Sequence, residues 1–556
     1  MLQFPWRPMD GKHGRAARWI RRSNLTARSK EMIDLLRGHA ARARAWGLRI
    51  VLKWVIAPLV CGWLVSYALG GGAFASALGV MAGLALFSWF AWRKVQQWRA
   101  PATAGDDLPN VHQAVALGKA MQRPAYRAEP MIEHAEQSKT IWVGATWRHT
   151  RKGIARDVPV VLTPDQMRKN HIAILGASGT GKTVITTSLL AQALRMGDAV
   201  VVIDPKSDEF APGILTREAR ALGRPTVFVD LRADVPQINP FFNASRAELE
   251  VLMTTALGLE PSGEPGVDFY RGEDRDGLAA LLDAITPEQT TLRGMVAVGA
   301  GMSEVTDRAN LWRNLKDLAR LEALATSQGP DLAAVIEQGG LIYIVGSVDD
   351  LRVQAAQKMA LTRIVQIIKN RPRTGARHTH LFLDEFKYSL GNTSLRALGT
   401  IRDQRATVLL AFQSYGDLHD CAGLPAQAVL GAAKGNTPLK LIFRLEDDQT
   451  ARELSSLSGQ YAVQTETTAK TTNVDGLEQG SYLNTMRSLV TPDMLSTAMP
   501  KPASSADAPV CWIFGDGVPK LIACGYMQPG EQPQVTPAPP LPTSSAPDAT
   551  KAQALI

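Results

Sequence analysis

The chain has 556 residues, too many for one ordinary hydrophobic core, so two to four domains are expected. Hydrophobic residues make up 45% of it and charged residues 20%, a composition that excludes a largely disordered protein. Its four cysteines are scattered and form no CxxC pair, and its histidines form no HExxH motif. A disulfide scaffold and a metal hydrolase are therefore not expected.

The positive charge is concentrated at the start of the chain. Residues 1–53 carry thirteen Lys or Arg against three acids, which leaves 48 of the 61 basic and 49 of the 52 acidic residues for the rest. The net charge of +9 thus belongs to a basic N-terminal segment, residues 1–49 with Lys53 just beyond it. It predicts no basic groove in the body of the protein.

An apolar stretch follows this segment. The 39 residues from Trp54 to Trp92 carry no charged side chain, and Gly70–Gly72 interrupt them near the middle. A single helix of that length would be about 58 Å long, twice the hydrocarbon thickness of a bilayer. We therefore predict a two-helix transmembrane hairpin over residues 50–92, with both ends in the cytoplasm because Arg and Lys flank both spans. The alternative is a helical hairpin buried in a soluble core.

Beyond a linker expected at 93–140, short apolar runs alternate with helical periodicity. The runs are HIAIL, AVVVID, TVFVD, LIYIVG, HLFLD and ATVLLAF, beginning at residues 171, 199, 226, 341, 380 and 406. This alternation predicts an α/β fold with a parallel sheet covered by helices.

Two segments depart from this alternation. Between residues 245 and 335 the strand signals vanish and helical periodicity continues, which predicts an all-α insertion in the α/β core. Residues 528–556 contain seven prolines, which predicts a disordered Pro-rich tail.

The strongest motif is GASGTGKT at 176–183, a full match to GxxxxGK[ST] between an apolar strand and a helix. Its glycines let backbone N–H groups turn inward around a phosphate, and the helix N-terminus adds its dipole. Lys182 supplies positive charge for the β- and γ-phosphates, and Thr183 offers a hydroxyl to Mg²⁺. The expected nucleotide-binding residues are Gly176, Ala177, Ser178, Gly179, Thr180, Gly181, Lys182 and Thr183.

An acid pair, Asp384 and Glu385, ends the run THLFLDEF. Asp384 is expected to hold Mg²⁺ through water, and Glu385 to polarise the water that attacks the γ-phosphate. Paired acids at a strand end are common in solvated turns, but the P-loop some 200 residues earlier favours catalysis.

Two further sites lie at strand ends. Gln413 follows ATVLLAF and is expected to sense the γ-phosphate, the alternative being a glutamine that faces solvent. The turn Asp204-Pro205-Lys206 follows AVVVID, at the edge of a parallel sheet where ligands gather. Whether it is functional or a simple turn stays open.

The order of the motifs resembles one family. GASGTGKT, VIDPKSDEF, INPF, LFLDEF, IRDQRATVLLAFQS and SLVTPDML occur in this order, and the chain resembles the type IV secretion coupling proteins of the TraD/TraG family of conjugation. The resemblance covers residues 50–525. It implies a RecA-like P-loop NTPase core, assigned here to 141–244 and 336–527, with the all-α insertion domain at 245–335.

The resemblance also implies roles for single residues. ATP and Mg²⁺ would be the cofactors, and the subunits would form a homo-hexamer. Arg402, eleven residues before Gln413, matches the family's proposed arginine finger, and Arg405 is a near competitor. The family's usual DPKGE is DPKSD here, and the loop between the two membrane helices is shorter than in many relatives.

By this resemblance the protein is a coupling ATPase of the bacterial inner membrane, with its ATPase domain and both termini in the cytoplasm. It would link a relaxase and its relaxosome DNA to the channel proteins of a type IV secretion system. ATP hydrolysis would then drive transfer of single-stranded DNA, of protein, or of both.

Three alternatives differ in kind. A double-stranded DNA translocase of the FtsK/HerA type shares the motor but usually adds a DNA-reading C-terminal module, where this chain is Pro-rich. A coupling ATPase for protein effectors only would share every motif. A non-enzymatic membrane scaffold would need a vestigial P-loop and acid pair, and both are intact.

Overall fold

The computed structural model describes residues 121–538, apart from 150–154, 422–423, 469–479 and 536. The basic segment 1–49 and the hairpin 50–92 lie outside the described residues, so both stay predictions. Within the part of the chain that is described, no helix is both long and apolar enough to cross a membrane.

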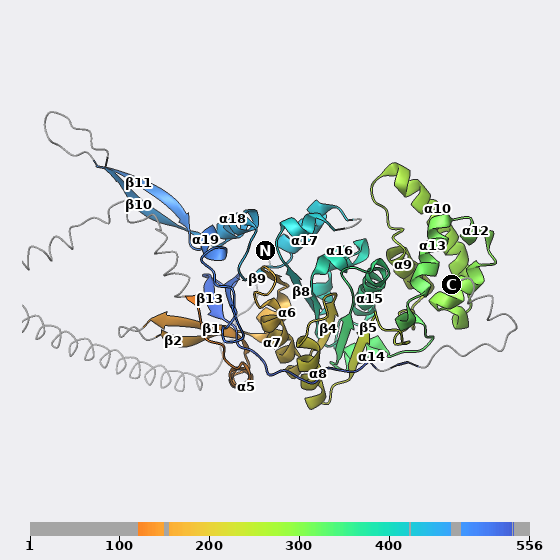
Figure 1. The fold of residues 1–556 in the computed structure, drawn as a ribbon, viewed down its shortest axis with the longest axis horizontal. Coiled ribbons are helices and arrows are strands. Elements are labelled where there is room, and N and C mark those ends of the chain that lie inside the picture. Colours follow the sequence, from red (N-terminus) through yellow and green to blue (C-terminus); the bar gives the residue numbers. More distant parts are fainter. Residues whose placement is uncertain (1–120, 150–154, 422–423, 469–479, 536, 539–556) are drawn as a thin grey trace, which may run out of the picture. The chain divides into compact units, whose positions relative to one another are not determined.

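An eleven-stranded sheet lies at the centre, in the order β2-β1-β13-β12-β9-β3-β8-β7-β4-β6-β5 (Figure 1). The seven neighbouring strands from β9 to β5 are parallel, and the remaining four extend the sheet in antiparallel fashion. The strands are β1 Ile141–His149, β2 Ala155–Leu162, β3 Ile172–Leu175, β4 Ala199–Asp204, β5 Thr226–Asp230, β6 Leu341–Val345, β7 Thr379–Leu383, β8 Ala406–Phe412, β9 Leu439–Ile442, β12 Val510–Phe514 and β13 Lys520–Ala523.

All six apolar runs that predict strands form strands of the parallel part. The reason is visible in β3, where Ile172 and Ile174 enter one hydrophobic core and Ala173 and Leu175 enter the other. A strand whose alternate side chains are all buried needs apolar residues throughout. The predicted α/β fold with a large parallel sheet is confirmed.

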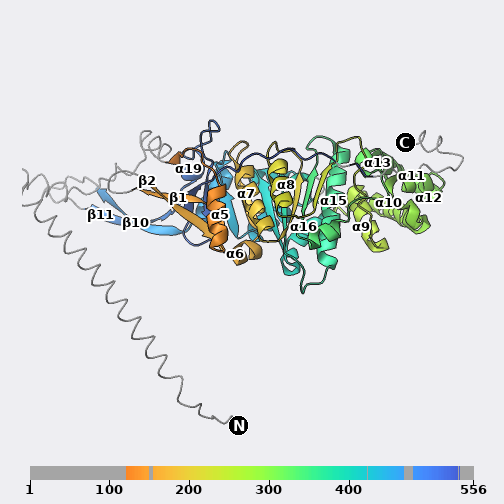
Figure 2. The same ribbon diagram turned by 90° about the horizontal axis from the view of Figure 1, so that it is seen from below.

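Helices cover both faces of the sheet (Figures 1 and 2). Side chains of α5, α7 and α8 belong to one hydrophobic core, and those of α15, α16 and α17 to the other. The helices are α5 Glu129–Gln137, α6 Pro164–Lys169, α7 Lys182–Arg195, α8 Ala211–Ala221, α9 Arg246–Ala256, α10 Pro265–Ala284, α11 Leu292–Gly299, α12 Ser303–Thr306, α13 Ala309–Ala319, α14 Leu332–Glu337, α15 Leu351–Asn370, α16 Asn392–Leu398, α17 Ala426–Gly435, α18 Asp448–Leu457 and α19 Pro492–Leu495.

Between β5 and β6 the structure contains helices and no strand, in a segment that is described throughout. We call α9 to α14 (residues 246–337) the helical block. Leu252, Leu281 and Leu311 are among the buried side chains of its interior. The block joins the sheet's covering helices at α15, where the Arg363 guanidinium pairs with Glu248 of α9 (3.1 Å). Arg363 also donates to Phe242 O (2.8 Å), just ahead of the block.

The antiparallel strands and α5 were not anticipated. The expected linker 93–140 contains α5, whose Ile132 and Ala135 are buried in the core beside the sheet. Ala145 of β1 pairs with Ala523 of β13, almost 380 residues away, and no local signal reveals such pairing. A separate hairpin, β10 (Gln460–Thr468) with β11 (Gly480–Ser488), follows α18.

The Pro-rich C-terminal region also differs from the expected disordered tail. We call residues 526–538 the C-terminal strap; of the predicted tail 528–556, the part up to 538 is described apart from 536. The described residues of the strap form no helix or strand, but Arg217 of α8 donates to Gln528 O (2.7 Å) and Pro529 O (3.1 Å). Further on, the Ala538 N–H donates to Pro236 O at 2.6 Å. The Arg217 contacts hold the strap beside α8, and the Pro236 contact holds its far end.

Candidate nucleotide-binding site

The P-loop connects β3 to α7. Gly176, Gly179 and Gly181 have φ values of 152°, 74° and 100°, which side-chain-bearing residues rarely adopt. A Cβ on Gly176 would lie 2.6 Å from Phe443 Cβ, and one on Gly181 only 2.4 Å from Pro509 Cβ. The loop therefore requires glycine at these two positions both for its conformation and for space.

Lys182 is buried at the first position of α7. Its Nζ donates to Gly176 O (2.6 Å) and Ala177 O (3.2 Å), so the ammonium group lies across the P-loop. Burial lowers the pKa of Lys182, while the nearby carboxylates of Glu385 and Asp384 act in the opposite direction. Thr183 follows it in the first turn of α7, and Ser178 is exposed in the loop. This cradle of N–H groups with one lysine fits a nucleotide phosphate.

The acid pair follows β7, which lies two strands from β3 in the sheet. The Asp384 N–H donates to Ile203 O (3.0 Å), which ties the pair to β4. Burial, followed by the carboxylates of Asp204 and Glu385, raises the pKa of Asp384 to about 7. Glu385 is 1% exposed and has a left-handed backbone, with φ 38°. The sequence-predicted acids and Lys182 thus gather at the carboxyl edge of the sheet.

Asp384 and Thr183 are the predicted Mg²⁺ ligands. The Asp384 carboxyl group lies near the carboxylates of Asp204 and Glu385, and a divalent cation bound there would neutralise their negative charge. Asp384 and Thr183 therefore fit Mg²⁺. Among the described residues there is no group of three or more His, Cys, Asp or Glu side chains that could hold a metal ion.

The turn after β4, whose role the sequence leaves open, contacts the acid pair. Lys206 forms an ion pair with Glu385. Buried Asp204 shapes the turn by accepting from the N–H groups of Lys206 (2.9 Å) and Asp208 (2.7 Å) and from the Tyr343 hydroxyl (2.7 Å). The turn therefore holds a cation against Glu385, the expected catalytic carboxylate.

Gln413 follows β8 at the same edge. Its Nε2 lies 3.5 Å from Glu385 Oε1, at the limit of a hydrogen bond, and the side chain is exposed. The carbonyl of Phe412, the preceding residue, accepts from the Gly176 N–H (3.3 Å). The structure therefore brings Gln413, Glu385 and the P-loop together.

Arg402 and Arg405 lie at the opposite edge. Arg402 belongs to the 3₁₀ turn Ile401–Gln404, which precedes β8, whereas Gln413 follows that strand. Seven residues of β-strand separate the two ends by about 23 Å. Both arginines are exposed, and neither lies at the P-loop of its own chain.

Residues 378–500 match the family model for the TraM recognition site of TraD and TraG. Mobilization protein A of Escherichia coli is 31% identical over 319 residues, which are 55% of this chain and 58% of that protein. The predicted resemblance to the TraD/TraG coupling proteins is confirmed. The chain nevertheless spans somewhat more than half of that curated relative's length.

The fold is similar to that of a solved coupling protein. The bacterial conjugative coupling protein TrwBdeltaN70, in its unbound monoclinic form, has 15% sequence identity and a TM-score of 0.51, over 75% of this chain and 96% of that one. Residues 151–227, which include the P-loop, also match the model for the central domain of the helicase HerA. The TraD/TraG-like region 378–500 contains the acid pair and Gln413.

Two cations beside the P-loop were missed by the sequence analysis. Arg444 follows β9, its carbonyl accepts from the Ala177 N–H (2.9 Å), and its guanidinium donates to Met499 O (3.2 Å). Lys501 has its Cε 3.7 Å from the point where a Gly179 side chain would begin. Arg444 could have been found as the polar residue after the apolar run LIF at 441–443, whereas nothing near Lys501 links it to a loop more than 300 residues earlier.

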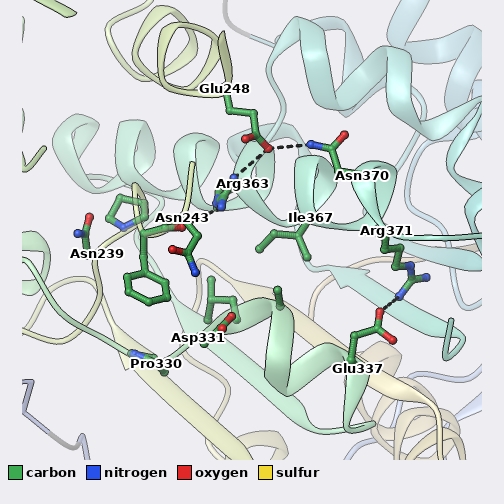
Figure 3. A pocket seen from close by; sticks show the side chains of 14 residues that line it. Asn239, Asn243, Glu248, Pro330, Asp331, Glu337, Arg363, Ile367, Asn370 and Arg371 are labelled. Atoms are coloured by element: carbon green, nitrogen blue, oxygen red, sulfur yellow. Dashed lines mark hydrogen bonds and ion pairs between the residues drawn. The ribbon is translucent and has the colours of Figure 1, made fainter. Parts of the chain in front are cut away.

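A cavity lies at the opposite edge of the sheet, between the helical block and α15 (Figure 3). It has a volume of about 300 Å³, and Arg363 and Arg371 line it. Arg363 is paired with Glu248, while Arg371 donates to Gln404 O (2.8 Å) and Arg405 O (2.9 Å). These arginines are engaged in holding the fold together.

Proposed function

We propose that this protein is the coupling ATPase of a conjugative type IV secretion system. It would connect relaxase-bound DNA to the inner-membrane channel and use ATP hydrolysis to drive transfer of single-stranded DNA, protein or both. The proposal rests on one observation, that Lys182 of the P-loop lies close enough to Asp384 and Glu385 to feel their charge. This acid pair also lies inside the region that matches the TraD and TraG family model, which connects the site to coupling proteins.

Each residue of the site has a distinct part in hydrolysis. The P-loop N–H groups and Lys182 would bind the phosphates, and Thr183 and Asp384 would hold Mg²⁺, which neutralises charge on the transferred phosphoryl group when bound. Glu385 would orient the attacking water and accept its proton, held in place by its ion pair with Lys206. Gln413 would contact the same water or the γ-phosphate.

Assembly into a hexamer is part of the proposal. Within one chain, Arg402 and Arg405 cannot reach the P-loop, because they precede β8 and the P-loop lies beside the other end of that strand. Arg402 would instead complete the site of a neighbouring subunit, and a ring of such contacts would couple hydrolysis around the hexamer.

The membrane location rests on the hairpin predicted at 50–92, with both termini in the cytoplasm. The basic segment before it would bind anionic lipid at the cytoplasmic surface. Protease digestion of sealed spheroplasts would test this, because only a short loop between the two spans should be accessible from outside.

A mating assay tests the function itself. Donor cells whose only copy of the gene carries Glu385→Gln should lose DNA transfer, while pilus assembly and protein abundance persist. Glu337→Gln is a matched control, because Glu337 lies at the far edge of the sheet and its carboxylate is half exposed. Normal transfer by the Glu385 variant would refute the proposal.

A second candidate, a double-stranded DNA translocase, is favoured by the match of residues 151–227 to HerA. The two functions differ in the nucleic acid that stimulates hydrolysis. Stimulation of the ATPase by single-stranded DNA supports the coupling protein, and stimulation by blunt duplex alone supports the translocase.

A further inference from the structure

Two loops at the carboxyl edge carry the residues that would act on the attacking water. Glu385 follows β7 and opens the 3₁₀ turn Phe386–Tyr388, and Gln413 follows β8 and precedes the 3₁₀ turn Gly416–His419. The direct contact between them is weak, because Gln413 Nε2 lies 3.5 Å from Glu385 Oε1. Other contacts must therefore hold the two loops at this separation.

An ion pair joins the two turns. Lys387 Nζ donates to Asp417 Oδ1 at 2.6 Å, and the two side chains are only 17% and 18% exposed. Burial alone would lower the pKa of Lys387, but the hydrogen bond and the charge of Asp417 outweigh it and raise that pKa. Because water and salt compete little with a shielded pair, this pair keeps its geometry better than an exposed one would.

The turn after Gln413 is held in place at several points. The Asp417 N–H donates to the hydroxyl of Ser414 (3.2 Å), the residue next to Gln413. The Tyr415 N–H donates to Thr450 Oγ1 of α18 (3.0 Å), which is buried. A shift of Asp417 is therefore transmitted to Gln413 through a short backbone that is fixed on both sides.

Three buried rings pack where the two loops leave their strands. Phe386 contacts Phe412 edge to face, with ring centroids 5.5 Å apart, and Phe412 lies 5.9 Å from the ring of Tyr415. This packing keeps the loops together, but apolar contact is non-directional. The ion pair adds a directional contact, which can fix the placement of one loop relative to the other.

We propose that Lys387 and Asp417 are positioning residues, whose ion pair sets the separation between Glu385 and Gln413 and thereby places the attacking water. Lys387 lies two residues after Glu385, and Asp417 lies four residues after Gln413. Catalysis is sensitive to such placement, because a misplacement of about 1 Å can lower a rate about 100-fold. This inference rests on the proposed ATPase function, and it adds two residues that lie outside the sequence motifs.

The test measures kcat and KM for ATP on the purified full-length protein, together with its unfolding midpoint in urea. Lys387→Met breaks the ion pair and should lower kcat about tenfold with KM unchanged, because the P-loop still holds the phosphates. Lys387→Arg keeps a cation that can pair with Asp417, so its kcat should stay within about twofold of the wild type.

A double variant separates positioning from stability. Lys387→Met leaves Asp417 as a largely buried carboxylate without its cation, which destabilises the fold whatever the role of the pair. Lys387→Met combined with Asp417→Asn removes both charges, so it should recover the unfolding midpoint and leave kcat low. Recovery of kcat together with the midpoint would show a purely structural role and refute the inference.

A second comparison asks whether the ion pair acts through Gln413. In a Gln413→Ala background there is no amide left to position, so Lys387→Met should cause no further loss of kcat. A loss as large as in the wild-type background would contradict the inference.

Arg195→Met is a control of matched burial. It removes an ion pair with Glu218 (2.8 Å) in the last turn of α7, where the two side chains are 18% and 10% exposed. It should lower the unfolding midpoint and leave kcat unchanged. An equal loss of kcat in the Arg195 and Lys387 variants would assign the effect to lost stability and overturn the positioning role.

Glu385→Gln distinguishes this inference from the function on which it rests. If the wild type hydrolyses no ATP, or if Glu385→Gln leaves turnover unaltered, the proposed site fails and the positioning role fails with it. If Glu385→Gln lowers turnover but Lys387→Met does not, the positioning role is refuted and the proposed ATPase stands.

Discussion

The two edges of the parallel sheet differ in what their loops do. At the carboxyl edge, the segments after β3, β4, β7 and β8 bring cations and carboxylates into contact, with Lys206 paired to Glu385 and Lys182 beside both acids. At the amino edge, the charged groups support the fold, as where Arg371 donates to the carbonyls of residues 404 and 405. Arg402 is the exception, since it is exposed there and has a catalytic role only if it reaches another molecule.

This difference teaches that a parallel sheet sorts residues by strand polarity. Groups that follow strands converge, however far apart they are in the chain, and groups that precede strands are carried to the other side. A motor of identical subunits can use both edges only by packing the amino edge of one subunit against the carboxyl edge of the next.

The largest expected effect comes from the amino edge. Arg402→Ala should lower ATP turnover by about 10³-fold, the scale of a lost arginine finger, with ATP binding retained. Turnover is measured in the assembled protein, and mixing with Lys182→Ala subunits should restore part of it, because some interfaces then regain both parts.

Two controls sharpen this result. Arg396→Ala removes an exposed arginine of α16 and should be silent. Arg405→Gly removes the competing side chain while suiting its left-handed backbone, φ 57°. If the Arg405 variant loses turnover and the Arg402 variant does not, the finger is Arg405; loss by neither would refute a role for this turn.

At the carboxyl edge, Glu385→Gln should lower turnover by about 10²-fold or more, the scale of general-base catalysis, because the amide keeps the shape and loses the carboxylate. A fluorescent ATP analogue should bind with unchanged affinity. Unaltered turnover would show that Glu385 does not act on the attacking water.

A smaller effect is expected from the turn after β4. Lys206→Met removes the cation paired with Glu385 and should lower kcat about tenfold through misplacement of the carboxylate, with little change in ATP affinity. Lys369→Met, at an exposed position in the last turn of α15, is the control. A change in affinity without a change in kcat would mean that Lys206 contacts the nucleotide directly.

The smallest effect is expected from Lys501, an exposed cation beside Gly179. Lys501→Ala should weaken ATP binding about threefold, as an exposed charge interaction would, and the difference should shrink as salt is added. Lys520→Ala serves as the comparison, because Lys520 is paired with Asp516 on another turn. A salt-independent loss would indicate a structural role.

The sequence predicts the carboxyl edge well and the rest less well. GASGTGKT and LFLDEF stand at the ends of buried strands, and parallel pairing then brings them together without further information. By contrast, the antiparallel strands depend on pairing between Ala145 and Ala523, which no local pattern encodes. The contact of Lys206 with Glu385 likewise depends on a turn shaped by buried Asp204.

The C-terminal strap illustrates a different limit. Its prolines correctly indicate the absence of helix and strand in the described part, but composition does not reveal that Arg217 and Gly213 of α8 hold it. Irregular backbone can be specific when its polar groups find fixed partners. Arg402 illustrates the opposite case, in which closeness in sequence does not mean closeness in space. It lies only eleven residues before Gln413, but β8 runs between them and places the two side chains at opposite edges of the sheet.

The strap also acts as a tether between two parts of the molecule. It begins beside α7, where Met527 and Thr183 line the same cavity, and reaches Pro236, ahead of the helical block, where the Ala538 N–H donates to the Pro236 carbonyl. Eleven residues of chain extend to roughly 40 Å at most. This length sets an upper bound on how far the root of the helical block can move from the P-loop before one of the tether's anchoring contacts breaks.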